Sequence, residues 1–176
     1  MPDSFHRGFA PVINQHTQVL VLGSMPSVKS LADQAYYAHP RNAFWPLMGE
    51  LFDFNANDDY TSRLNSLLAV GVGLWDVYAA CERPGSLDSA IVNSTAEFND
   101  FVSLFAKYPE VRVLAFNGKT AFTRFERLAK NSHDLANFLK HKKLLCLPST
   151  SPANATLSIN DKQVAWQSIR GFLLNS

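Results

Sequence analysis

The sequence has little of several features that mark a specialised class of protein. Only two of its 176 residues are cysteine, Cys81 and Cys146, and neither belongs to a C-x-x-C or C-x-x-H spacing. Two isolated cysteines make neither a disulfide framework nor a four-thiolate metal cluster, and they are typical of a reducing compartment. The longest apolar runs fall far short of the roughly 20 residues that cross a membrane. No basic-then-apolar segment opens the sequence, so we expect no signal peptide.

A strong net charge is also missing. The 16 Lys and Arg residues nearly balance the 15 Asp and Glu residues, which leaves a formal net charge of +1 and a weak field for binding nucleic acid. The hydrophobic fraction of 47% excludes an intrinsically disordered chain. The five His residues show no paired spacing, so we expect no metal and no cofactor. The composition predicts one soluble domain over residues 1–176, located in the cytoplasm.

The positive charge that is present gathers in one segment. Residues 107–143 carry nine Lys and Arg against three Asp and Glu, whereas residues 1–106 carry five against eleven. This basic segment would either give one face of the molecule a positive field suited to phosphates or supply ordinary solvated helix faces. Charge alone does not decide between these two interpretations.

The pattern of apolar residues predicts strands that alternate with helices. Four apolar runs of strand length, rich in Val, Leu or aromatic residues, fall at 18–22, 73–77, 111–116 and 143–147. Such alternation is typical of an α/β fold, and we expect a single three-layer domain whose central, mostly parallel four-stranded sheet has helices on both faces. Ligands bind these folds beyond the carboxyl ends of the strands. Functional residues are therefore expected just after each strand.

Three stripes of apolar residues at spacings of three and four predict amphipathic helices. The stripes consist of Phe98, Phe101, Val102 and Phe105, then Phe122, Phe125 and Ala129, and finally Ala165, Ile169, Phe172 and Leu173. The last of these predicts a single closing helix.

Two loops at predicted strand ends are rich in hydroxyl groups. Residues 23–27, Gly-Ser-Met-Pro-Ser, follow the first strand, and residues 147–154 follow the last with two prolines that bracket three hydroxyls. Rigid loops of this kind suit contacts to a phosphate or a base edge. Both segments are equally consistent with simple turns, since neither contains G-x-G-x-x-G, a P-loop or G-x-S-x-G.

The segment 36–45 is less ordinary, because it packs four aromatic residues, a His, an Arg and an Asn into ten positions. We expect Phe44 and Trp45 to enter the following helix and face the core. His39, Arg41 and Asn42 fit a purely structural role poorly, since polar groups among aromatic rings need partners or a ligand. The segment is therefore predicted to be a loop that faces a ligand.

Taken in order, these segments resemble the uracil-DNA glycosylase superfamily. Residues 23–27, 30–31 and 36–45 are similar to its first motif, and residues 147–154 are similar to its closing motif. The similarity is closest to the hypoxanthine-DNA glycosylase branch, and the mismatch-specific uracil/thymine branch is a near relative. The resemblance implies cleavage of the N-glycosidic bond between a damaged base and deoxyribose, with DNA as the partner and no membrane.

The resemblance also implies a catalytic residue. Several branches have a catalytic Asp or Asn directly after the first strand, where this sequence has Ser24, Met25 and Pro26. In the hypoxanthine branch the catalytic amide lies in the His-Pro-Arg-Asn stretch, which here makes Asn42 the candidate. An amide is too weak a base to deprotonate water, but it can orient a water molecule beneath C1′. Ser149 stands where other branches have His or Asn, so that loop supplies no histidine electrophile.

Further roles follow from the same resemblance. Tyr37 would stack on the flipped base, unless it is a packed loop aromatic. Asp76 would accept an N–H from the base, such as N1–H of hypoxanthine, unless it caps a helix. The implied base-binding residues are Gly23, Ser24, Met25, Tyr37 and Asp76, and the implied DNA-backbone residues are Ser27, Arg41, Ser149, Ser151 and Asn154.

We therefore expect a monomeric, monofunctional DNA glycosylase of base-excision repair, associated with the nucleoid, that removes a deaminated base, with hypoxanthine favoured. The first alternative is a mismatch-specific uracil or thymine glycosylase of the same fold. The second is a catalytically silent nucleic-acid-binding module, which the missing first-loop carboxylate and the modest net charge support. A small-molecule hydrolase would need a Ser-His-Asp arrangement that the sequence does not indicate.

Overall fold

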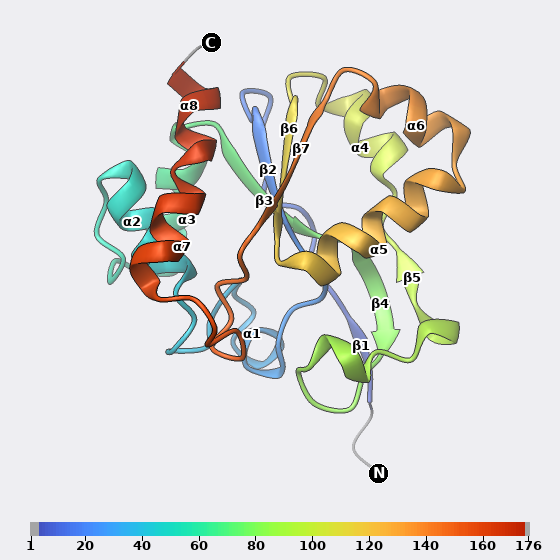
Figure 1. Ribbon diagram of the computed structural model, residues 1–176, viewed down its shortest axis with the longest axis horizontal. Coiled ribbons are helices and arrows are strands. Elements are labelled where there is room, and N and C mark those ends of the chain that lie inside the picture. The colour runs from blue at the N-terminus through green and yellow to red at the C-terminus, as the bar shows by residue number, and fades with distance from the viewer. Residues whose placement is uncertain (1–3, 175–176) are drawn as a thin grey trace.

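Four parallel strands form the centre of the computed structural model, which describes residues 4–174 (Figure 1). They are β2 (Val19–Gly23), β3 (Val72–Asp76), β6 (Val113–Asn117) and β7 (Lys143–Leu147), in the spatial order β3-β2-β6-β7. All three pairings between neighbours are parallel, so the predicted sheet is confirmed. An isolated antiparallel bridge between Val12 and Leu74 extends the edge at β3.

The central strand β2 shows why the sequence folds this way. Every residue of β2 is buried, and side chains alternate between the two faces of a strand. Val19 and Val21 join the core on one face, whereas Leu20 and Leu22 join the core on the other. A strand that is apolar on both faces is stable only when helices cover both sides of the sheet.

Helices cover both faces, as predicted (Figure 1). One core is closed by α2 (Phe44–Phe52), α3 (Tyr60–Ala69), α7 (Ile159–Trp166) and α8 (Ser168–Leu174). The other is closed by α4 (Phe101–Lys107), α5 (Lys119–Lys130) and α6 (His133–Leu139). The short helix α1 (Val28–Asp33) follows β2 directly and lies at the carboxyl ends of the strands.

A second, antiparallel sheet was not predicted. It consists of β1 (Phe5–Arg7), β4 (Tyr78–Glu82) and β5 (Glu97–Phe98) in the order β1-β4-β5. Two 3₁₀ turns, Asp88–Ala90 and Asn93–Thr95, lie between β4 and β5. This small sheet adds a wall beside the carboxyl end of the central sheet (Figure 1).

Two of the predicted helices differ in detail. Phe98 lies in β5 rather than in a helix, because the Asp100 side chain accepts the Ser103 N–H at 3.0 Å and starts α4 at Phe101. The single closing helix is in fact two, α7 and α8, separated at Gln167. The buried side of these two helices includes Trp166, which is fully buried, whereas the predicted Ala165 is only half-buried.

Among residues 4–174, no helix is both long and apolar enough to cross a lipid bilayer.

Candidate active site

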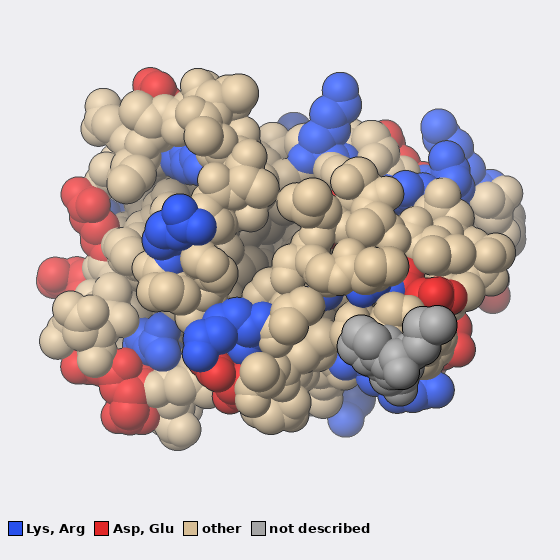
Figure 2. Space-filling model, turned by 90° about the horizontal axis from the view of Figure 1, so that it is seen from below, with Lys and Arg blue, Asp and Glu red and all other residues tan. Residues whose placement is uncertain are grey.

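A cavity of about 620 Å³ opens at the carboxyl ends of the parallel strands. Figure 2 views the molecule from this side and shows a hollow with Lys and Arg side chains around it, whereas most acidic groups lie nearer the edges. All predicted site residues except Arg41 line the cavity. These are Gly23, Ser24, Met25, Ser27, Tyr37, Asn42, Asp76, Ser149, Ser151 and Asn154.

Asp76 is the most unusual group in the cavity. It ends β3 and is only 4% exposed, and its Oδ2 has no hydrogen-bond partner among the described residues. The pKa of Asp76 is raised to about 8, mainly by burial and in addition by the charge of Asp88, while Arg83 opposes the shift. At neutral pH the carboxyl is therefore mostly protonated, and it can donate as well as accept a hydrogen bond. The alternative that Asp76 caps a helix is wrong, because strand β4 follows it.

Gly23 gives Asp76 its space. The two residues pair in the parallel register of β2 and β3. A Cβ atom at Gly23 would lie 2.7 Å from Asp76 Oδ1 and 3.5 Å from Tyr37 Oη. Because Gly23 has no side chain, the Asp76 carboxyl and the Tyr37 hydroxyl can both lie close to its Cα atom in the cavity.

Replacing Gly23 with alanine is expected to lower any activity of this cavity by at least about tenfold, because a displacement of the order of 1 Å at a reacting site is costly. The fold should tolerate the change at an overpacking cost of about 1–3 kcal/mol. Gly171→Ala in α8 is the matched control, since its Cβ would meet nothing within 4 Å. Activity and urea denaturation of both variants measure the two effects. Equal activity in the Gly23→Ala variant and its control would contradict the placement of the site.

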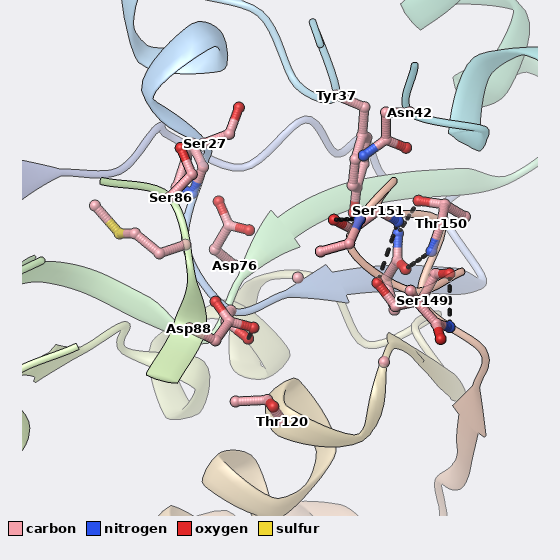
Figure 3. A pocket seen from close by; sticks show the side chains of 18 of the residues that line it. Ser27, Tyr37, Asn42, Asp76, Ser86, Asp88, Thr120, Ser149, Thr150 and Ser151 are labelled. Atoms are coloured by element: carbon pink, nitrogen blue, oxygen red, sulfur yellow. Dashed lines mark hydrogen bonds between the residues drawn. The ribbon is translucent and has the colours of Figure 1, made fainter. Parts of the chain in front are cut away.

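Tyr37 forms an aromatic wall of the cavity. Its ring stacks on Phe44 with centroids 3.9 Å apart and an interplanar angle of 25°. Its backbone has a φ of 56°, a left-handed conformation that is uncommon for a residue with a bulky side chain. Strain of this kind persists where the surroundings hold it, often at functional sites. Figure 3 shows the ring nearly edge-on, with Asp76 beyond one of its faces.

The Tyr37 hydroxyl is a second buried polar group without a hydrogen-bond partner in the described part of the chain. Burial raises the pKa of the Tyr37 phenol well above its usual value, and the charge of Asp76 adds to this against a lowering effect of Asn117. Tyr37 therefore stays protonated over the physiological range. Two neighbouring unsatisfied groups, one acid and one phenol, are costly unless a ligand satisfies them.

Asn42 is held in a fixed orientation at the cavity. Its Oδ1 accepts the Phe44 N–H at 3.0 Å, at the start of α2. The next residue, Ala43, donates its N–H to the Thr150 carbonyl at 3.0 Å, which ties this loop to the closing loop. An amide oxygen has two lone pairs, so Asn42 can still accept a second hydrogen bond.

His39 and Arg41 belong to the same loop but do not line the cavity. His39 Nδ1 accepts the Arg41 N–H at 3.1 Å, so in neutral His39 the proton is on Nε2. This contact shapes the turn before Asn42. The Arg41 side chain is exposed to solvent.

The closing loop uses its hydroxyl oxygens to shape itself. Ser149 Oγ accepts the Ser151 N–H, and Ser151 Oγ accepts the Ala153 N–H, both at 3.2 Å. Asn154 Nδ2 donates to the Ser149 carbonyl at 3.2 Å. In the described part of the chain, neither of these two seryl hydroxyls donates a hydrogen bond to an acceptor. Ser27 differs, because its hydroxyl caps α1 by accepting the Ser30 N–H and donates to Ser30 Oγ, each at 3.1 Å.

Sequence reasoning missed several residues of the cavity. Asn117 and Thr150 form a reciprocal pair, in which Asn117 Nδ2 donates to Thr150 Oγ1 and the Thr150 N–H donates to Asn117 Oδ1, both at 2.9 Å. Asn117 directly follows a predicted strand, so the strand-end rule could have found it. Asp88, which accepts a hydrogen bond from Ser24 Oγ at 3.0 Å, comes from a segment with no recognisable pattern.

The basic segment 107–143 contributes both to the cavity wall and to the solvent-exposed surface. Lys119 and Thr120, at the start of α5, line the cavity, while several other basic residues of the segment face solvent. No group of three or more His, Cys, Asp or Glu that could hold a metal ion occurs between residues 4 and 174.

An aromatic ring, a buried acid and a rim of hydroxyl groups line one cavity at the carboxyl end of the parallel sheet of this α/β protein. The chain belongs to the uracil DNA glycosylase superfamily, whose sequence profile matches residues 10–170. The predicted resemblance, fold and enzyme class, that of a DNA glycosylase, are thereby confirmed.

Individual relatives agree with this membership. A hypoxanthine DNA glycosylase of Methanosarcina acetivorans is 37% identical over 164 residues, which cover 93% of this chain and 96% of the relative. A hypoxanthine DNA glycosylase of Methanosarcina barkeri is 39% identical over 114 residues, 64% of this chain and 71% of the relative. The solution NMR structure of a candidate uracil DNA glycosylase from M. acetivorans superposes with a TM-score of 0.79 at 34% identity, covering 97% of this chain and 99% of that one.

Proposed function

We propose that this chain is a monofunctional DNA glycosylase that hydrolyses the bond between hypoxanthine and deoxyribose in DNA. The observation that carries the proposal is the buried Asp76 carboxyl, which has an unpartnered oxygen in a cavity walled by Tyr37. A protonated carboxyl offers an O–H donor beside a C=O acceptor. Hypoxanthine offers the complementary C6=O acceptor beside its N1–H donor. The sequence analysis gave Asp76 only the accepting role, and the raised pKa adds the donating one.

The reaction begins when the damaged nucleotide rotates out of the duplex into the cavity. The base stacks on the face of Tyr37 opposite Phe44, and its six-membered edge faces Asp76 near Gly23, Ser24 and Met25. As the C1′–N9 bond breaks, its electron pair passes to the base and the sugar becomes an oxocarbenium-like cation. The Asp76 O–H stabilises the negative charge that develops on the base.

Asn42 positions the water molecule. Its Oδ1 is fixed by the Phe44 N–H, and the second lone pair of that oxygen accepts a hydrogen bond from water beneath C1′. The water oxygen bonds to C1′, one proton of the water passes to solvent, and the departing base takes up a proton. The products are free hypoxanthine and an abasic site, and the step needs no cofactor.

The rim of the cavity contacts the DNA backbone in this proposal. The free hydroxyl hydrogens of Ser149 and Ser151 donate to phosphates on either side of the lesion, with Asn154 beside them. Ser27 contributes through the loop that it caps, and the exposed Arg41 reaches a phosphate outside the cavity. We propose that the chain acts as a monomeric single domain in the cytoplasm, in contact with the nucleoid.

The test is base release by the purified protein from duplexes that contain hypoxanthine, uracil or thymine opposite guanine, with free bases identified by mass spectrometry. Free hypoxanthine together with abasic sites is the expected product. Release of uracil or thymine alone would place the chain in the mismatch-specific branch. Binding of all three duplexes without release of any base would make the chain a binding module and overturn the proposal.

A further inference from the structure

The segment between β4 and β5 is fastened to the loop that follows β2. The guanidinium of the buried Arg83 donates to the Met25 carbonyl at 3.4 Å and to the Pro26 carbonyl. The Val28 N–H donates to Ser86 Oγ at 2.9 Å. These three hydrogen bonds fix the position of the segment, and therefore of its side chains, relative to the cavity.

Asp88 is the acidic side chain that this segment brings to the cavity wall. Its Oδ2 accepts a hydrogen bond from Ser24 Oγ at 3.0 Å, and Figure 3 shows it on the same side of the cavity as Asp76. Ser24 directly follows Gly23, whose backbone lies against Asp76. Asp88 is therefore connected, through Ser24 alone, to the part of the cavity where Gly23 and Asp76 meet.

Between residues 4 and 174, neither carboxyl of this pair lies within salt-bridge distance of a basic side chain. No salt bridge within the described residues involves Asp76 or Asp88. The charge of Arg83 acts on both carboxyls, yet its guanidinium donates to the Met25 and Pro26 carbonyls. Two carboxyls that share one poorly solvated cavity without a salt bridge cannot both ionise cheaply.

We propose that Asp88 is a positioning residue that orients Ser24 and, by its charge, keeps Asp76 in the protonated form that meets the base. This inference rests on the proposed function and deepens it, because it explains how the pocket offers a hydrogen-bond donor to a carbonyl of the base at neutral pH. Asp88 acts through Asp76 and Ser24, without contact to the reacting atoms.

The charges around the pair support this role. Burial is the main cause of the raised pKa of Asp76, and Asp88 is the group that raises it further, against Arg83. Burial also raises the pKa of Asp88, against the Ser24 hydrogen bond, Arg83 and Arg124 of α5. The charge of one or the other carboxyl also raises the pKa of five further groups, which are Tyr36, Tyr37, Tyr60, Tyr78 and Cys81.

The test is Asp88→Asn, which keeps an acceptor for Ser24 and removes the charge. Loss of the charge lowers the pH at which Asp76 ionises, by about one pH unit for two carboxyls that share a poorly solvated cavity. Base release from a hypoxanthine duplex, relative to wild type, is then expected to fall about fivefold between pH 6 and pH 8. A merely structural role would lower the rate by the same factor at both pH values, and this outcome would overturn the proposal.

A second measurement does not depend on activity. The carbon-13 shift of the Asp76 carboxyl, assigned by its loss in Asp76→Asn, is followed against pH in the free protein. Its midpoint is expected to move to lower pH in Asp88→Asn and to stay in place in Asp58→Asn, an exposed control. An unchanged midpoint in Asp88→Asn would overturn the role of Asp88. Absence of base release by the wild type would instead overturn the proposed function.

Discussion

Replacing Asn42 with alanine is expected to slow the release of hypoxanthine from a duplex by at least about 100-fold, the cost typical of losing a positioned reactant. The side chain is fixed by the Phe44 N–H at 3.0 Å, so the water that it holds is placed before the C1′–N9 bond breaks. The measurement is the single-turnover rate with enzyme in excess. Under these conditions the chemical step is separated from product release.

The control for this variant is Asn57→Ala, which removes an exposed amide from a surface turn. Duplex affinity of the Asn42→Ala variant should stay within a few-fold of the wild type, because the phosphate contacts lie elsewhere on the rim. Loss of the contact to the Phe44 N–H costs about 1 kcal/mol of stability, which leaves the variant folded. A wild-type rate in this variant would remove Asn42 from catalysis.

Replacing Asp76 with asparagine is expected to remove the decline of activity near pH 8 and to change how stability depends on pH. The amide offers an N–H donor beside a C=O acceptor, the same pattern as the protonated carboxyl, but it does not titrate. Base release by the variant should therefore stay constant between pH 7 and pH 9, whereas a pKa of about 8 lowers the protonated fraction of Asp76 in the wild type about tenfold over this range. In the wild type, activity should itself decline as pH rises through about 8, where Asp76 loses its proton. The measurement is the pH profile of single-turnover base release for the wild type and the variant.

The stability effect follows from the same pKa. The folded protein keeps the Asp76 proton up to about pH 8, whereas the unfolded chain releases it near the ordinary value of 3.8. Between these values, the wild type therefore loses unfolding free energy as pH rises, at up to ~1.4 kcal/mol per pH unit. Asparagine does not titrate, so the advantage of Asp76→Asn should grow from pH 5 to pH 8 in urea denaturation. A constant difference would contradict the raised pKa.

The central sheet was predictable because three of its four strands, β2, β3 and β6, are buried on both faces and the edge strand β7 is also mostly apolar. Such strands appear in the sequence as uninterrupted apolar runs, and all four were found close to their observed bounds. The antiparallel sheet left no such signal. Its strands β1 and β5 have only three and two residues, which is too short for the alternation of a strand to be recognised in the sequence. Strand β4 follows β3 after a single residue, so the sequence does not separate the two strands.

The candidate site was predictable to the extent that it depends on strand ends. Gly23, Asp76 and Ser149 all follow or end a parallel strand, and the rule that ligands bind there brought them together correctly. Asp88 could not be found in this way. Its place in the cavity depends on the contacts of Arg83 with the Met25 and Pro26 carbonyls, which join residues that are 57 and 58 positions apart.

The unsatisfied groups of the cavity were likewise invisible in the sequence. The left-handed backbone of Tyr37, the stacking of its ring on Phe44 and, among the described residues, the lack of a partner for its hydroxyl are properties of the folded chain. The sequence indicated an aromatic ring at this position and an acid at the end of β3, but the pKa of that acid depends on burial, which only the fold supplies.

The most direct test of the central claim is a crystal structure of the Asn42→Ala variant bound to a duplex with one deoxyinosine. The account predicts an extrahelical hypoxanthine in the cavity, stacked on Tyr37, with its C6=O and N1–H edge within hydrogen-bond distance of the Asp76 carboxyl. A base that stays within the helical stack of a bound duplex, or one that enters the cavity without reaching Asp76, would contradict the account.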